Sequence, residues 1–271
     1  MRHLSLLMAA LLLLMSCGGN SNKSNDCDYD FIDESSLTKI NNSIINGDAA
    51  AFASMVDYPI RRKYPIKDIE DSATMVKFFP IIVDDSLKNM VRNLGLNGWK
   101  AMGWRGIMFN NGELWSDINI IAINHMSDVE QQLLDSLRAK EIASLHPSLR
   151  TENFIPSICF KDIDIDAIYR IDYFHPDSNK KYPYRLAVYK NTRHLSGKPD
   201  AVLNGYLDIE GSAAVHYFYF FDHDTNSHIN FTIDYYEKPD TIYGDVELFG
   251  LKTNESHRLK PVYWLDYTAS K

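Results

Sequence analysis

The spacing of the apolar residues changes midway along this chain, and that change limits what the chain can fold into. Residues 33 to 146 mix helical and strand-like stretches, whereas residues 154 to 268 read almost entirely as short strands separated by Gly, Pro and Asn. In the stretch HINFTIDYY, Ile229, Phe231 and Ile233 alternate with polar residues, as in a strand with one wet face. The sequence therefore predicts an α+β protein whose second part is a β-rich sandwich or small barrel.

The first part opens with two predicted helices. Leu37, Ile40 and Ile44 recur at helical spacing, and Gly47 follows where a helix end favours positive φ. Asp48 is placed to cap a second short helix over residues 49–56. Further helical patterns cover residues 68–79, where Pro80 should kink or end the helix, residues 84–93, and a segment from a Ser127–Glu130 capping box to about Leu145.

A hairpin is predicted in the stretch WRGIMFNNGELWSD, because an Asn-Gly turn between strand-like residues is the strongest short hairpin signal. The pairing parity places one set of side chains on the same face: Arg105, Ile107, Phe109, Leu114, Ser116 and Ile118. An arginine at the end of an apolar face is a candidate for binding an anion, since its guanidinium offers a bidentate fork. The alternative is that Arg105 lies at the surface and its stem covers apolar area.

A targeting segment precedes both parts. Arg2 supplies a positive start, and a mostly apolar run of twelve residues extends from Leu4 to Met15, which matches a secretory signal. That run is shorter than the roughly 20 apolar residues that a membrane-spanning helix needs. We therefore expect the segment to direct export and then to be removed.

The end of this segment, Leu14-Met15-Ser16-Cys17, resembles the lipobox of bacterial lipoproteins. In that family the cysteine thiol receives a diacylglyceryl group, the chain is cut before the cysteine, and the new amino group is acylated. The resemblance implies a signal peptide over residues 1–16 and a lipid anchor on Cys17, at the start of a polar tether over residues 17–30. In that family a glycine rather than an aspartate behind the cysteine favours export to the outer membrane, and the resemblance implies the same for Gly18. An ordinary secreted protein, whose signal happens to end near a cysteine, is the alternative.

The net charge and the absence of known motifs limit the classes of partner and site that this chain is expected to have. The chain has 28 Lys and Arg against 36 Asp and Glu, and removing Arg2 with the signal leaves 27 against 36, a net charge of about −9. An acidic chain argues against nucleic acid as a partner. No metal-ligand spacing, phosphate loop or nucleophile motif is present, so we predict no metal, no cofactor and no catalytic residue. Whether Cys27 and Cys159 form a disulfide is open.

Two acidic stretches are similar to cation sites but are interpreted as structural. Asp162, Asp164 and Asp166 alternate with apolar residues, as in an ordinary half-buried strand. Asp222 and Asp224 begin a stretch similar to a calcium loop, but that stretch lacks the glycine and the glutamate that such a loop requires. Neither stretch is expected to hold a metal.

The order of elements in the first part resembles the NTF2-like fold, a curved sheet wrapped around helices to form a cone. The stretch NGDAAAFASMV at the second helix, the YP-I motif and the GWRGIM-NGE-W hairpin carry the resemblance. It implies an NTF2-like domain over residues 31–146, followed by an all-β domain over residues 151–271; an unrelated α+β domain is the alternative. Within such a cone Arg105, Tyr58 and His125 are candidate ligand-binding residues, but no spacing allows the family's catalytic residues to be carried over.

These features favour a noncatalytic accessory or binding lipoprotein, anchored in the membrane through lipid on Cys17 and facing the periplasm or the cell surface. Aromatic-rich strands favour a protein or glycan contact on the β-rich domain. Two alternatives remain. One is a small-molecule enzyme of the NTF2-like type, which needs a buried Asp or His with a shifted pKa. The other is a periplasmic immunity or inhibitor protein, which the acidic charge permits.

Overall fold

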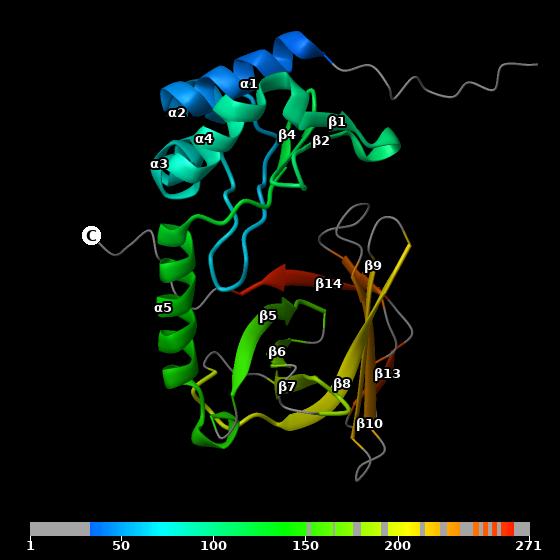
Figure 1. Ribbon diagram of the computed structural model, residues 1–271. Helices are drawn as coiled ribbons and strands as arrows, with labels where there is room; N and C mark the ends of the chain where they lie inside the picture. The colour runs from blue at the N-terminus through cyan, green and yellow to red at the C-terminus, as the bar shows by residue number, and fades with distance from the viewer. Residues whose placement is uncertain are drawn as a thin grey trace, which may run out of the picture.

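The computed structural model describes residues 33–150, 153–164, 166–175, 180–190, 195–211, 215–222, 227–233, 241–243, 246–248, 251–253 and 256–262. The predicted signal, the tether, Cys17 and Cys27 lie outside the described residues. Within those residues the protein is of the α+β class, with five α-helices and two antiparallel sheets (Figure 1). None of the helices in this part of the chain combines the length and the apolar character needed to cross a membrane.

The two helices predicted at the start of the first part are present. α1 spans Glu34–Asn46 and ends at Gly47, whose φ of 71° is a left-handed conformation that glycine adopts without strain. α2 spans Ala49–Ala53, and the side chain of Asp48 accepts a hydrogen bond from the Ala51 amide at 3.0 Å, as its capping position predicts. α2 therefore starts where expected but stops short of residue 56.

The next two helices are α3, Ser72–Ile82, and α4, Asp85–Leu94. α3 begins later than residue 68 because Asp71 caps it, and the Asp71 carboxylate accepts from the Thr74 amide at 2.7 Å. Pro80 lies inside α3 without ending it, since Phe79 and Ile82 on either side are buried in the core and hold the last turn in place.

The predicted hairpin belongs to a four-stranded antiparallel sheet in the order β1-β2-β3-β4. Its strands are β1 Trp99–Ala101, β2 Ile107–Phe109, β3 Leu114–Asp117 and β4 Asn119–Ile123. Phe109 pairs with Leu114 and Ile107 pairs with Ser116, which is the parity that the sequence predicts. All four side chains are buried, and the three apolar ones share a core with residues of α1 to α4. The prediction is wrong for Ile118, which lies at the turn between β3 and β4 with a φ of 70° and is 68% exposed.

The long helix α5, Asp128–Ser144, leads from the first part to the second (Figure 1). Ser127 caps it as predicted, with the Ser127 hydroxyl accepting from the Glu130 amide at 3.0 Å. The carboxylate of Glu130 pairs with Arg62 instead of returning to the Ser127 amide. The predicted capping box is therefore only half formed.

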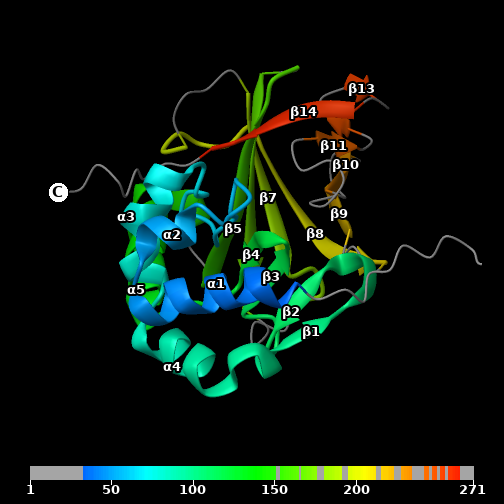
Figure 2. The same ribbon diagram turned by 90° about the horizontal axis from the view of Figure 1, so that it is seen from above.

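All strands of the second part that the structure describes belong to one antiparallel sheet. Its long strands are β5 Phe154–Asp162, β6 Ala167–Phe174, β7 Tyr184–Lys190, β8 Ala201–Glu210, β9 Val215–Asp222 and β10 Ser227–Ile233. Its short strands are β11 Thr241–Tyr243, β12 Val246–Leu248, β13 Leu251–Thr253 and β14 Ser256–Pro261. β11 pairs with both β10 and β14, and β14 pairs with β5 in this curved sheet (Figure 2). The second part is β-rich as predicted, but these strands do not divide into two separate sheets.

The sheet is buried on both faces at β6. One face carries an apolar core that includes five aromatic residues: Phe160, Tyr169, Phe218, Phe220 and Phe231. On the other face, β5 to β7 pack against the end of α5. The alternation predicted for β10 is confirmed, since Ile229, Phe231 and Ile233 are all buried in the core.

The aspartates predicted to alternate along a strand lie at a hairpin turn, so that prediction is wrong. β5 ends at Asp162, and the Asp162 carboxylate accepts from the Asp164 amide at 2.9 Å. Asp166 adopts a positive φ of 49° and forms an ion pair with Lys161 at 2.6 Å. Short aspartate side chains stabilise such turns by bonding to nearby backbone. The residues Asp224 and Asn226, in the second acidic stretch, lie outside the described residues.

Contacts of α5 connect the two parts of the protein. Leu134 and Leu137 pack with Ile66 of the loop over residues 57–70, which reaches down beside α5 in Figure 1. The Tyr64 hydroxyl of the same loop donates to the Glu141 carboxylate at 3.0 Å. At the end of the helix, the following residue Leu145 packs with residues of the large sheet. The division predicted between residues 146 and 151 stays a prediction, and α5 contributes to cores on both sides of it.

Alkaline pH is expected to destabilise the protein through its buried tyrosines. Burial raises the pKa of Tyr64, Tyr169 and Tyr189 above the ordinary value of 10.0. As the pH rises above that value, the unfolded chain releases these protons while the folded protein retains them, so stability that is present below pH 10.0 is progressively lost.

Tyr64→Phe removes one of these groups. We expect it to reduce the slope of unfolding free energy against pH by up to about 1.4 kcal/mol per pH unit. Urea unfolding between about pH 9 and 12 measures this slope. A slope identical to that of the wild type would contradict the assignment of Tyr64 to the alkaline loss of stability.

Candidate functional site

Arg105 does not lie on the buried face of the hairpin. It ends a short 3-10 turn, Gly103–Arg105, and β2 begins only at Ile107. Gly106 between them has a φ of 88°, so the alternation of the strand does not extend back to Arg105. The Arg105 side chain is exposed, and its guanidinium carbon lies 5.8 Å from the centre of the Trp115 ring. Arg105 therefore lies at the surface, as in the alternative to an anion-binding role.

Tyr58 is held at the end of α2. Its hydroxyl donates to the Ala53 carbonyl at 2.8 Å. Burial raises its pKa, although a hydrogen bond with Ser72 acts in the opposite direction. These contacts give Tyr58 a packing role, and none of them connects it with Arg105 or His125.

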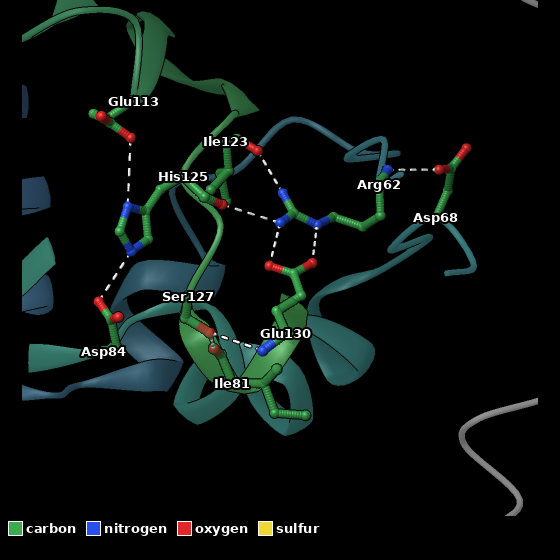
Figure 3. Close-up of polar contacts among 9 residues, drawn as sticks. All are labelled: Arg62, Asp68, Ile81, Asp84, Glu113, Ile123, His125, Ser127 and Glu130. Carbon is green, nitrogen blue, oxygen red and sulfur yellow. Dashed lines mark hydrogen bonds and ion pairs between the residues drawn. The ribbon is translucent and has the colours of Figure 1, made fainter. Parts of the chain in front are cut away.

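His125 is buried between two carboxylates that come from distant parts of the first half (Figure 3). Its Nε2 lies 2.9 Å from Oδ1 of Asp84, and its Nδ1 lies 3.4 Å from Oε2 of Glu113. Asp84 also caps α4 by accepting from the Leu87 amide at 2.9 Å. His125 therefore ties the segment before α5 to the start of α4 and to the turn between β2 and β3.

This arrangement determines what His125 can do chemically. A general base must direct an unprotonated nitrogen at the proton that it removes. Both ring nitrogens of His125 instead face a carboxylate, one from Asp84 and one from Glu113. The geometry fits a structural clamp better than a catalytic base.

A buried ion pair between Arg62 and Glu130 lies beside His125 (Figure 3). Arg62 Nε donates to Glu130 Oε1 at 2.6 Å, and a second guanidinium nitrogen contacts the other carboxylate oxygen. The guanidinium also donates to the carbonyls of Ile123 and His125, the latter at 3.1 Å. The two side chains are 2% and 0% exposed. One arginine thus fastens the loop over residues 57–70 to the end of β4 and the start of α5.

A second buried network joins α5 to the large sheet. Arg170 contacts the Glu141 carboxylate and lies 2.7 Å from the Asp172 carboxylate, which also pairs with Arg185 at 2.7 Å. Arg185 further donates to the Leu149 carbonyl at 3.1 Å. All four charged residues are at least nine-tenths buried, and their two positive and two negative charges balance.

The charges of this network depend on one another. Burial alone lowers the pKa of Arg170, but Asp172 and Glu141 outweigh that effect and raise it. Burial raises the pKa of Glu141, and Arg170 opposes that rise. Arg170 therefore stays charged because its two carboxylate neighbours replace the water that it has lost.

These ion pairs are not predictable from the sequence. Arg62 lies in the stretch YPIRRKYPI, and the sequence predicts only a capping role for Glu130. Arg170, Asp172 and Arg185 lie in strands of otherwise apolar character. Charged residues inside such strands were the available signal, but their partners could not be derived from spacing.

The surface of the large sheet offers a different kind of candidate. The side chains that alternate outward from β8 and β9 pair in register: Tyr206 with Tyr219, Asp208 with Tyr217, and Asn204 with Phe221. These six residues are named the aromatic face. The inward neighbours in the same strands, including Leu203, Phe218 and Phe220, belong to the core. The aromatic face is therefore not needed to fill the interior of the sheet.

No protein-family model, curated protein or solved structure matches this chain. Within the residues that the structure describes, no group of three His, Cys, Asp or Glu side chains is placed to hold a metal ion. The fold and the contacts define an α+β protein whose buried polar clusters serve its architecture and whose aromatic residues reach the surface on β8 and β9.

Proposed function

We propose that this protein is a lipid-anchored lipoprotein of the bacterial cell envelope, exported to the outer membrane, that binds a partner and catalyses no reaction. The observation that carries the proposal is the run Leu14-Met15-Ser16 directly before Cys17. Lipid on Cys17 would hold the protein at the membrane, because several acyl chains together give a stable anchor.

The NTF2-like assignment of residues 31–146 is part of this proposal. It is supported by the helices α1 to α4 that share one core with a short antiparallel sheet, and by the register of the β2–β3 hairpin. An enzyme of this type would need a group free to move a proton, whereas His125 has both nitrogens against carboxylates. The noncatalytic function is therefore preferred over the enzymatic alternative.

The proposed contact with a protein or glycan lies on the β-rich part of the chain. Aromatic side chains are enriched in protein interfaces. Tyr206 is 39% exposed on the aromatic face, in a strand that also exposes Val202 at 42%. These two residues make β8 the strand with which we expect a partner to make contact.

Replacing Cys17 with alanine tests the anchor. Cys17→Ala should move the protein from the membrane fraction to the soluble fraction, because the acceptor of the lipid is lost. Cys27→Ala is the matched control, since Cys27 lies in the polar stretch just beyond and should leave the protein at the membrane. Cells that express each variant are fractionated to locate the protein. The mass of the N-terminal peptide then shows whether it is acylated. Release by Cys27→Ala and retention of Cys17→Ala would reject the lipobox.

A further inference from the structure

The two tyrosines at the centre of the aromatic face stand side by side. Tyr206 and Tyr219 pair directly across β8 and β9, and their ring centres are 5.0 Å apart with planes at 24°. Two rings at this separation and angle are stacked on each other, so they project from the sheet instead of lying flat on it. Phe221, farther along β9, contacts Tyr182 edge to face at 4.5 Å. The face is therefore a ridge of upright rings and not a flat platform.

Carboxylates of β8 border this ridge. Asp208 and Glu210 are exposed on β8 beside the tyrosine pair. Between Lys198 and Lys238 the sequence contains seven Asp or Glu and no Lys or Arg. Burial raises the pKa of Tyr219, and the nearby Tyr206, Glu210 and Asp208 raise it further.

The position of the ridge leaves it accessible to a partner. α5 covers the sheet on the side of β5 to β7, whereas β8 to β10 lie on the opposite side of the second part in Figures 1 and 2. Asn204, Tyr206 and Asp208 are all exposed along β8. A long row of exposed side chains is thus available on one strand.

We infer that the aromatic face binds a cationic polypeptide segment, rich in Arg or Lys, of a partner protein. The inference rests on the proposed binding function and names the chemistry of the partner. The inference is based on charge complementarity. Electron-rich tyrosine rings attract a guanidinium or ammonium group, and the carboxylates of Asp208 and Glu210 can form ion pairs with that group. Anionic partners are disfavoured by the same two carboxylates.

A cationic protein segment is favoured over a neutral glycan by the charge beside the rings. Tyr206 and Tyr219 cover part of each other's faces, so each ring offers only its outer face to a ligand. Sugar hydroxyls can donate hydrogen bonds to Asp208 and Glu210, but only a cation gains charge attraction to them as well. A planar guanidinium, by contrast, can lie against an outer tyrosine face while it donates to a carboxylate.

Equilibrium binding tests this inference with the full lipidated protein purified in detergent micelles. The probes are a fluorescent oligoarginine peptide, an oligoglutamate peptide of equal length, and a neutral glucan oligosaccharide. The face variants are Tyr206→Ala and the pair Asp208→Asn with Glu210→Gln. The matched controls are Trp104→Ala, which removes an aromatic residue of similar exposure at 41%, and the pair Asp117→Asn with Asp135→Asn, which removes two exposed carboxylates elsewhere.

We expect the oligoarginine peptide to bind with an affinity that falls as salt rises. Each face variant should weaken it by about tenfold, whereas the controls should change it by less than about twofold. Circular dichroism shows whether each variant keeps its fold. Equal weakening by controls and face variants would reveal general attraction to an acidic protein and overturn the inference.

Binding of the neutral glucan that Tyr206→Ala abolishes, without binding of oligoarginine, would assign the face to a glycan and also overturn the inference. So would the failure of both probes to bind. Neither result bears on the anchor, which is tested separately by the fractionation of Cys17→Ala. If the protein captures partners in its own cells equally well with and without the face variants, the binding function stands and the aromatic face is not its site.

Discussion

Replacing Arg170 with methionine is expected to lower the free energy of unfolding by about 3 to 5 kcal/mol, the cost of leaving buried charges without their partner. Methionine fills much of the same volume but cannot pair with Glu141 or Asp172, which are 1% and 0% exposed. The Glu141 carboxylate would keep only the hydrogen bond from Tyr64, and Asp172 would keep only Arg185 among the pairs described. Denaturant unfolding followed by circular dichroism measures the loss.

A rescue variant separates lost charge pairing from lost volume. Adding Glu141→Gln to Arg170→Met removes one of the charges left without a partner, so part of the lost stability should return. Arg92→Met is the surface control, because Arg92 is exposed and donates to the nearby Asn89 in α4, and it should change stability by less than about 0.5 kcal/mol. A loss of stability from Arg170→Met no larger than that of Arg92→Met would show that the network does not stabilise the fold.

Arg62→Met is expected to have the second large effect, again about 3 to 5 kcal/mol of unfolding free energy. The substitution leaves Glu130 buried without its cation and removes the donors to the Ile123 and His125 carbonyls. It should also weaken the attachment of the loop over residues 57–70 to α5, which the Arg62 side chain shares with Tyr64 and Ile66.

A double-mutant cycle with Glu130→Gln isolates the pair. If the two side chains stabilise the fold through each other, the double variant should lose clearly less stability than the sum of the single variants. Lys63→Met, at an exposed neighbouring position, serves as the control for changing charge in the same loop. Additive losses in the cycle would mean that Arg62 acts through the two carbonyls alone.

Local chemistry explains why several elements were predictable. Gly47 ends α1 and Asp48 caps α2 because each acts on backbone groups only a few residues away. The β2–β3 register follows in the same way from a turn signal and the two-residue period of a strand. The alternation of β10 was likewise readable because one side of that strand is buried.

Predictions that extended a local pattern beyond its element failed for identifiable reasons. Arg105 was placed on a strand face, but Gly106 breaks the extended backbone before the strand begins. Asp164 and Asp166 were read as part of a strand, but alternation of polar and apolar residues continues through the tight turn between β5 and β6. In both cases the residue types alternate as in a strand, but the backbone at those positions is not extended.

By itself the sequence determined the end of α1, the caps of α2 and α5, the hairpin register and the β-rich character of the second part, since these depend on interactions within a few residues. Tertiary structure alone decided which charges are buried and with which partner. Arg62 meets Glu130 across 68 positions and Arg170 meets Glu141 across 29, separations at which residue spacing carries no information about contact. Taking these charges out of water is tolerated only where the folded chain supplies an opposite charge, so their pairing becomes visible only when the packing of α5 is known.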